Sequence, residues 1–245
     1  MDYQSQFYPE SRFGGFTDID GTIAFYTRIH SLVGADAVVL DVGCGRGEYG
    51  EDRIEVRRQL RIFKGKVARV IGIDVDEAGQ KNPFLDEFHL LNGARWPLDD
   101  GSVDLCLADC VMEHVTDPDG FLAEAERVLR PGGYLCLRTT NGRGYVALAA
   151  RLVPNRDHSR VLSRVQENRK PEDVFPTVYR CNTRGQLRRA LERHGLEGVV
   201  YGYESEPKYL QFSRLAYLVG VIFERLAPRS LRNALFVFAR KTERR

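Results

Sequence analysis

The sequence predicts an α/β fold in which a seven-stranded, mostly parallel sheet carries helices on both faces. Short apolar runs alternate with longer amphipathic runs through the middle of the chain, and this alternation is typical of βα units. The first apolar run passes directly into a glycine-rich turn, which is the position where such sheets bind ligands. A chain of 245 residues, 43% of them hydrophobic, is long enough for one domain of this kind.

The predicted strands are apolar runs of four to six residues, short enough to be strands rather than helices. The run that ends in Asp41 and Val42 is the first of them, and the run that ends in Asp74 is the second. In chain order the seven predicted strands are Val38–Val42, Val70–Asp74, Phe88–Leu91, Val103–Ala108, Tyr134–Thr139, Val199–Tyr203 and Ala234–Ala239.

Amphipathic segments between these runs predict the helices. Asp117–Arg130 has apolar residues at helical spacing, and Asp117 followed by Pro118 suits a helix start. Pro131-Gly132-Gly133 is expected to stop this helix and turn the chain. Further helices are predicted over Glu51–Phe63, Thr183–His194 (with Gly195 after it) and Tyr209–Leu226.

We expect one α/β domain over residues 35–245, preceded by an N-terminal cap segment over residues 1–34. Residues 141–182 are polar and Arg-rich, and three prolines interrupt them. This segment is too long for an ordinary connection, which takes a few residues, so it predicts a lid or cap insertion with its own short helices.

The composition narrows the class of protein. The 36 Lys and Arg residues nearly balance the 34 Asp and Glu residues, so the net charge of +2 makes nucleic acid an unlikely partner. We see no signal peptide and no membrane span, and we expect a cytoplasmic protein. The five cysteines have no zinc-binding spacing, and no metal site is predicted. We interpret one cluster of basic residues as the solvated face of a helix. Its members are Arg57, Arg58, Arg61, Lys64 and Lys66.

The turn after the first strand is the most informative segment. Asp41 is followed by glycines at every second position, which allow a tight turn and the close approach of a ligand to the backbone. A dinucleotide turn has the pattern GxGxxG, but the third glycine position holds Glu48, and a carboxylate there would repel a pyrophosphate. S-adenosylmethionine has no phosphate and carries a sulfonium, so Asp41 suits it better. A nicotinamide-dependent oxidoreductase stays an alternative.

Three segments in order, LDVGCGRG, IGIDVD and WPLDDGSVDLCLADCVMEHVTDPDGFLAEAERVLRPGGYL, resemble the class I S-adenosylmethionine-dependent methyltransferases of the type 11 group. The resemblance spans residues 38–139 and implies a Rossmann-like sheet. It implies that Asp74 holds the ribose of the donor and that Val75 flanks the adenine. This sequence has Gly93 before Ala94, where the family commonly has an Asp, so the adenine contact falls to the backbone of Ala94. The remaining donor contacts that it implies are Asp41, Gly43, Cys44, Gly45, Gly47 and Asp109.

The acceptor is less well defined. His114 is the candidate base for an oxygen acceptor, and we place it at the start of the helix after the fourth strand. The competing interpretation is that Glu113 and His114 cap and brace that helix. The turn Asp109-Cys110-Val111-Met112 differs from the Asn-Pro-Pro-Tyr turn that methyltransferases of bases and glutamine share. We therefore expect a small-molecule, sugar or lipid-linked acceptor, and a homodimer is possible. A non-catalytic donor-binding module is a further alternative, because of Gly93.

Overall fold

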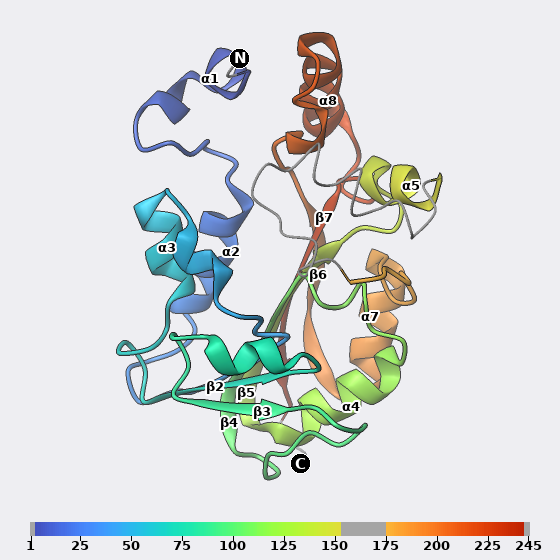
Figure 1. Ribbon diagram of the computed structural model, residues 1–245. Coiled ribbons are helices and arrows are strands. Elements are labelled where there is room, and N and C mark those ends of the chain that lie inside the picture. The colour runs from blue at the N-terminus through green and yellow to red at the C-terminus, as the bar shows by residue number, and fades with distance from the viewer. Residues whose placement is uncertain (1–2, 153–174, 243–245) are drawn as a thin grey trace.

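A computed structural model describes residues 3–152 and 175–242, and its centre is one seven-stranded sheet (Figure 1). The strand order is β3-β2-β1-β4-β5-β7-β6, which confirms the predicted fold class. Each predicted strand is present, and five of the seven are one to six residues longer than predicted. Their bounds are β1 Val38–Val42, β2 Arg69–Asp74, β3 Glu87–Leu90, β4 Val103–Asp109, β5 Leu129–Thr140, β6 Leu196–Tyr203 and β7 Ala234–Lys241.

The sheet is parallel except at one edge. β1 pairs in parallel with both β2 and β4, and β4 pairs in parallel with β5. β7 lies antiparallel between β5 and β6. Because the chain leaves β1 toward β2 and β3 and later returns to the other side of β1 with β4, the strand order reverses between β1 and β4. In sheets of this class the ligand crevice lies at that switch point.

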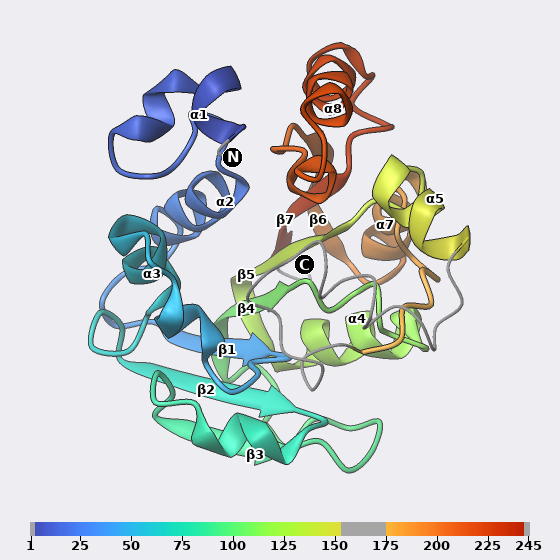
Figure 2. The same ribbon diagram turned by 45° about the horizontal axis from the view of Figure 1, so that its top comes forward.

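Helices cover both faces of the sheet, as Figures 1 and 2 show. On one face α2 (Gly21–His30) and α3 (Glu55–Arg61) enclose a core that includes Phe25 and Ile29, both fully buried. On the other face α4 (Pro118–Val128) and α7 (Arg184–Arg193) enclose a second core with Leu122 and Leu187. Although α2 falls within the predicted cap segment 1–34, its apolar side packs on the sheet.

Two predicted helices differ in extent from the structure. The helix predicted over Glu51–Phe63 is divided into a 3-10 turn, η2 (Glu48–Glu51), and the seven-residue α3. The helix predicted over Tyr209–Leu226 begins only with α8 (Arg214–Leu226), where the Ser213 side chain accepts a hydrogen bond from the Ala216 amide. A separate 3-10 turn, η5 (Lys208–Leu210), precedes it.

The end of α4 also differs from the prediction. The prediction placed a turn at Pro131-Gly132-Gly133, but the helix ends at Val128 and β5 already begins at Leu129. Leu129 is fully buried and pairs with Val103, so packing draws the chain into the sheet before the glycines. A register shift between Val103 and Leu105 accommodates the irregular segment. The predicted start at Asp117 is correct, because its side chain accepts a hydrogen bond from the Gly120 amide.

The N-terminal segment packs against α8, beyond the edge of the sheet. The N-terminal residues form α1 (Gln4–Phe7) and the 3-10 turn η1 (Pro9–Arg12), and their aromatic rings pack on α8. The Phe7 ring centroid lies 5.5 Å from that of Tyr217, and Tyr8 is buried in the same cluster. The inner side of α8 therefore packs on the N-terminal segment.

The predicted lid over residues 141–182 is described only at its ends. Its first part forms α5 (Tyr145–Leu152), which meets α8 through an edge contact between Tyr145 and Phe223. Residues 153–174 lie outside the described residues, so the lid stays a prediction. Within the part of the chain that is described, no helix has the length and apolarity required to span a bilayer.

Candidate functional site

The predicted site residues converge on the edge of the sheet where β1, β2 and β4 end. These strands are neighbours in the order β2-β1-β4, and their last residues are Val42, Asp74 and Asp109. Figure 2 shows the three strands side by side, with the turn after β1 lying over this edge. The edge coincides with the switch point of the sheet, so topology and sequence motif indicate the same place.

The glycine turn has the left-handed backbone conformation that glycine favours. The φ angles of Gly43, Gly45 and Gly47 are 69°, 54° and 78°. A β-carbon at Gly43 would also lie 2.5 Å from Val111 Cγ2, and one at Gly47 would lie 2.6 Å from Asn82 Oδ1. Both the conformation and the close packing therefore exclude larger residues at these two positions.

Asp74 holds this turn against the end of β2. It is buried, its Oδ2 accepts a hydrogen bond of 2.9 Å from the Gly45 amide, and its Oδ1 accepts one of 3.0 Å from the Asp76 amide. A carboxylate offers about four acceptor positions, so two remain for a ligand. Val75, the next residue, is 68% exposed, so a large apolar side chain lies beside this carboxylate.

Asn82 is a structural residue of the turn that the sequence analysis missed. Its buried side-chain amide donates hydrogen bonds of 3.0 and 3.2 Å to the carbonyl oxygens of Cys44 and Gly45. It comes from the segment after η3 (Glu77–Lys81), and nothing in its local sequence distinguishes it from a loop asparagine. The Cys44 thiol faces the opposite way, into the core beside Leu85, and burial raises its pKa. The predicted donor contact of Cys44 therefore stays a prediction for its backbone alone.

Asp41 is a half-buried carboxylate at the end of β1. Among the described residues, no hydrogen-bond donor reaches either of its oxygens. Burial is the main cause that raises the pKa of Asp41, repulsion from Asp109 adds to the rise and Arg61 opposes it, and together they bring the pKa to about 8. A buried carboxylate without a donor is unfavourable when ionised, and a cationic ligand would stabilise its charged form.

Asp109, at the end of the neighbouring strand β4, has hydrogen-bond donors at both of its carboxylate oxygens. Arg138 on β5 donates from Nε to Oδ1 and from Nη2 to Oδ2, both at 2.6 Å, and the Tyr26 hydroxyl donates to Oδ2 at 3.0 Å. Burial by itself would raise the pKa of Asp109, but Arg138 outweighs it and lowers the pKa to about 2. Its side chain therefore holds together the ends of β4, β5 and α2, and the predicted donor contact of Asp109 stays a prediction.

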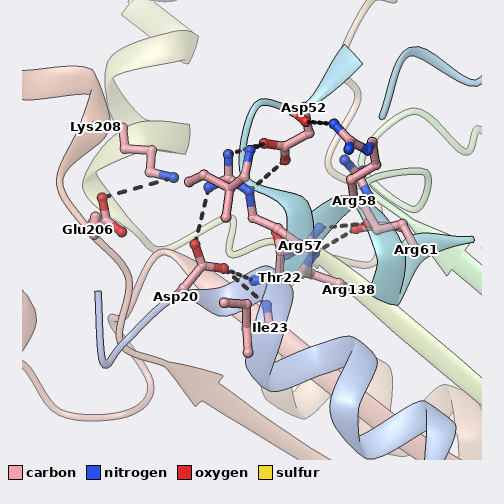
Figure 3. Close-up of polar contacts among 12 residues, drawn as sticks. Asp20, Thr22, Ile23, Asp52, Arg57, Arg58, Arg61, Arg138, Glu206 and Lys208 are labelled. Atoms are coloured by element: carbon pink, nitrogen blue, oxygen red, sulfur yellow. Dashed lines mark hydrogen bonds and ion pairs between the residues drawn. The ribbon is translucent and has the colours of Figure 1, made fainter. Parts of the chain in front are cut away.

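Arg61 lies between the two carboxylates. Its guanidinium is 5.8 Å from the Tyr26 ring centroid and 5.1 Å from that of Tyr49, and its Nη2 lies 3.5 Å from Asp109 Oδ2. Figure 3 shows Arg61 and Arg138 approaching each other from α3 and β5. The Nε of Arg61 is buried and meets no hydrogen-bond acceptor in the described part of the chain. Arg61 is thus a site residue, whereas the sequence predicted a solvated helix face.

Arg57 fixes α3 to α2 and so positions Arg61 and Tyr26. It pairs with Asp52 at 2.5 Å and with Asp20 at 3.1 Å, as Figure 3 shows. Asp20 also caps α2 by accepting hydrogen bonds from the amides of the second and third helix residues. Arg57 is mostly buried as well, so the predicted solvated face is wrong for both arginines.

His114 lies in a turn four residues before α4, not at the start of that helix. Its Nδ1 is 2.9 Å from the carbonyl oxygen of Pro176, and its ring has an edge contact with Phe175. Because a carbonyl only accepts, Nδ1 carries a proton here and Nε2 is the basic nitrogen of the neutral ring. The neighbouring Glu113 is buried and accepts hydrogen bonds from Thr139 and Thr140, so it braces this turn against β5.

The turn after β3 is open. Gly93 and Ala94 are exposed, and a β-carbon at Gly93 would meet no atom within 4 Å. The predicted contact between the Ala94 backbone and adenine stays a prediction. Among the described residues, no group of three or more His, Cys, Asp or Glu side chains has an arrangement that could hold a metal ion.

The sequence comparisons with known proteins match mainly the part of the chain that contains this site. Residues 40–137 match the family described as "Methyltransferase domain". A probable S-adenosylmethionine-dependent methyltransferase of Mycolicibacterium smegmatis is 42% identical over 123 residues, which are 47% of this chain and 42% of that protein. The malonyl-[acyl-carrier protein] O-methyltransferase of Yersinia pestis is 35% identical over 42% of this chain and 36% of that protein. The chain thus spans less than half the length of these curated relatives.

Solved structures show the same fold. A SAM-dependent methyltransferase from Archaeoglobus fulgidus has a TM-score of 0.56 and 18% identity, covering 98% of this chain and 100% of that chain. A geranyl diphosphate C-methyltransferase from Streptomyces coelicolor A3(2), solved with Mg²⁺, geranyl diphosphate and S-adenosyl-L-homocysteine, has a TM-score of 0.55 and 16% identity. That alignment covers 90% of this chain and 78% of that chain.

Proposed function

Because residues 40–137 belong to the class I S-adenosylmethionine-dependent methyltransferases of the type 11 group, we propose that this chain methylates a small-molecule, sugar or lipid-linked acceptor. The observation that supports this best is the pair of carboxylates beside the glycine turn. Asp41 has no hydrogen-bond donor among the described residues, and Asp74 keeps two acceptor positions after binding the turn.

S-adenosylmethionine supplies an activated methyl group on a sulfonium, so the protein mainly has to align donor and acceptor and exclude water. The residues around the turn fit this cofactor. Asp41 offers a negative charge that lacks a partner, which suits the ammonium and sulfonium end. Asp74 offers acceptors for the ribose hydroxyls, and the exposed Val75 beside it offers an apolar surface for adenine.

Arg61 suits the carboxylate of the donor. Its Nε lacks an acceptor among the described residues, and its guanidinium is held between two tyrosine rings. The geometry does not suit a dinucleotide equally well, because the Glu48 carboxylate would lie 3.1 Å from a β-carbon at Gly45. A pyrophosphate at this turn would therefore meet a negative charge.

For the acceptor, His114 is the candidate base. Its Nε2 is the nitrogen that could take a proton, since Nδ1 faces the Pro176 carbonyl. We expect His114→Gln to lower kcat while leaving the affinity for the donor unchanged. If the substitution changes neither quantity, His114 has only the bracing role of its neighbour Glu113.

Titration calorimetry with S-adenosylmethionine and with NAD tests the donor assignment. We expect about micromolar binding of S-adenosylmethionine, and a loss of at least about 100-fold for Asp74→Ala, because two hydrogen bonds to a charged group disappear. Asp76→Ala is the matched control, since this nearby carboxylate accepts a hydrogen bond from the Ala78 amide and from no other group among the described residues. Unchanged affinity in Asp74→Ala would remove the ribose assignment, and binding of NAD alone would overturn the proposed function.

The acceptor class needs a separate experiment. Tritiated S-adenosylmethionine is incubated with the protein and a cell extract, and the products are separated into aqueous, lipid, protein and nucleic-acid fractions. We expect label in the aqueous or lipid fraction. Label in protein or nucleic acid would contradict the acceptor assignment, and tight donor binding with no label in any fraction would identify a non-catalytic binding module.

A further inference from the structure

Helix α8 has two apolar faces, and in the described part of the chain only one of them is used in packing. Its inner face buries Tyr217, Gly220 and Val221, and these residues meet the N-terminal segment and η5. Glu224 continues the same face and is also buried, with its carboxylate bound to the Ser205 amide and the Asn233 side chain. This face accounts for how α8 is held to the rest of the protein.

The outer face of α8 presents an apolar stripe to solvent. We define it by five α8 residues and the preceding Phe212, whose exposed fractions range from 37% to 78%. At 3.6 residues per turn the five lie within about 100° of arc, opposite the buried face. The members of the stripe are Phe212, Leu215, Leu218, Val219, Ile222 and Leu226.

The exposed charged residues that flank the apolar stripe in the chain have one sign. The exposed charged residues between positions 206 and 231 are all cations, namely Lys208, Arg214, Arg225 and Arg229. The acidic residues of the same segment, Glu206 and Glu224, are both buried. The exposed charges of the segment that carries the stripe are therefore positive, although the whole chain has a net charge of only +2.

This charge pattern decides between two possible occupants. In a symmetric dimer built on the stripe, the cations of one copy would lie beside the cations of the other, and like charges across an interface are costly. An anionic lipid surface instead complements both the apolar stripe and its basic border. A helix of 13 residues is about 20 Å long, so it would lie in the interface rather than cross the bilayer.

We propose that the apolar stripe of α8, with its border of exposed arginines and lysine, docks this protein on the surface of an anionic lipid bilayer. Figures 1 and 2 show α8 at the outer end of the molecule, beyond the sheet, where a flat surface can reach it. This inference does not depend on methyl transfer, because none of these residues belongs to the proposed donor site.

Sedimentation with lipid vesicles tests the proposal. The protein is mixed with vesicles of phosphatidylglycerol and phosphatidylcholine, or of phosphatidylcholine alone, and the bound fraction is measured over a range of salt concentrations. We expect binding to the anionic vesicles that weakens as salt is added. The double variant Leu215→Gln/Val219→Gln should weaken it at least about tenfold, because two large apolar contacts with the lipid disappear.

Matched variants make the result specific. Val56→Gln/Val199→Gln also replaces two exposed apolar side chains, but on α3 and β6, and it should bind as the unmodified protein does. Arg214→Gln/Arg229→Gln should weaken binding to anionic vesicles and reduce its dependence on salt. All four positions are exposed, so thermal melting should verify that the variants are folded.

Several results would overturn the proposal. One is that the protein stays in the supernatant with anionic vesicles, and another is that Leu215→Gln/Val219→Gln binds them as well as the control variant. A third is a dimer in light scattering that this double variant dissociates, together with no vesicle binding. That last result would assign the stripe to a second copy of the chain.

Discussion

Asp41 and Asp109 lie at the ends of adjacent parallel strands and on the same face of the sheet, yet their environments are opposite. Asp41 meets no hydrogen-bond donor in the described structure, and burial raises its pKa to about 8. Asp109 is buried as well, but the bidentate pair with Arg138 and the hydroxyl of Tyr26 lower its pKa to about 2. The difference shows that the position of a carboxylate at a strand end does not set its charge, because its hydrogen-bond partners and neighbouring cations do.

The two regions also differ in how the chain builds them. The turn beside Asp41 is made of consecutive residues, and its pattern is visible in the sequence. The partners of Asp109 come from α2, α3 and β5, which are far apart in the chain. Arg61 joins the two regions because it is close to both carboxylates.

We expect the largest effect, a loss of stability, from a substitution in the network around Asp109. Arg138→Gln would leave a buried carboxylate without its main partner, and we expect a loss of about 3–5 kcal/mol in the free energy of unfolding. Urea denaturation measures this loss. The double variant Asp109→Asn/Arg138→Gln removes the unpaired charge and should recover much of the stability. If the double variant is as unstable as the single one, Arg138 contributes through packing and the comparison fails.

Gly43→Ala should have the next largest effect, on the Asp41 side. Alanine is disfavoured at a φ of 69°, and its β-carbon would lie 2.5 Å from Val111. We expect a loss of about 2 kcal/mol or more in stability, together with weaker donor binding. Adding Val111→Ala should recover the part that is due to the close contact. No recovery would show that the backbone conformation alone sets the requirement for glycine.

The pH dependence of stability should distinguish the two carboxylates directly. The pKa of Asp41 rises from 3.8 to about 8 on folding, so its ionisation should lower stability progressively between about pH 4 and pH 8. The pKa of Asp109 falls from 3.8 to about 2, so its contribution is complete above about pH 4 and is lost as the pH falls toward 2.

Asp41→Asn separates these contributions. A single proton changes stability by at most about 1.4 kcal/mol for each pH unit, and this variant should lose that slope between about pH 4 and pH 8. Urea denaturation at a series of pH values, without donor, measures it. Identical profiles for the variant and the unmodified protein would mean that the pKa of Asp41 is not raised.

The smallest expected effect concerns Arg61. Arg61→Met should lower donor affinity about tenfold, which is the scale of one hydrogen bond to a charged group. Arg58→Met is the matched control, because Arg58 is on the same helix but pairs with Glu55 and the Asp52 carbonyl. Equal affinities for the two variants would mean that Arg61 serves only to hold α3 against Asp109.

Local patterns in the sequence were enough to predict the succession of strands and helices along the chain and the position of the glycine turn. Alternating apolar runs predicted all seven strands, and Asp117 and Thr183 correctly marked where α4 and α7 begin. These features depend on residues close together in the chain, because periodicity and capping are local. The ends of β1 and β2 could be assigned for the same reason.

Only the folded structure shows which polar side chains have hydrogen-bond partners and which are buried. The network of Asp109, Arg138 and Tyr26, the position of Asn82 and the burial of Arg57 and Arg61 each depend on contacts between distant segments. The start of α8 at Arg214 and the early start of β5 likewise follow from packing. A local pattern specifies the backbone, but the pKa and availability of a side chain depend on neighbours that only the folded chain brings together.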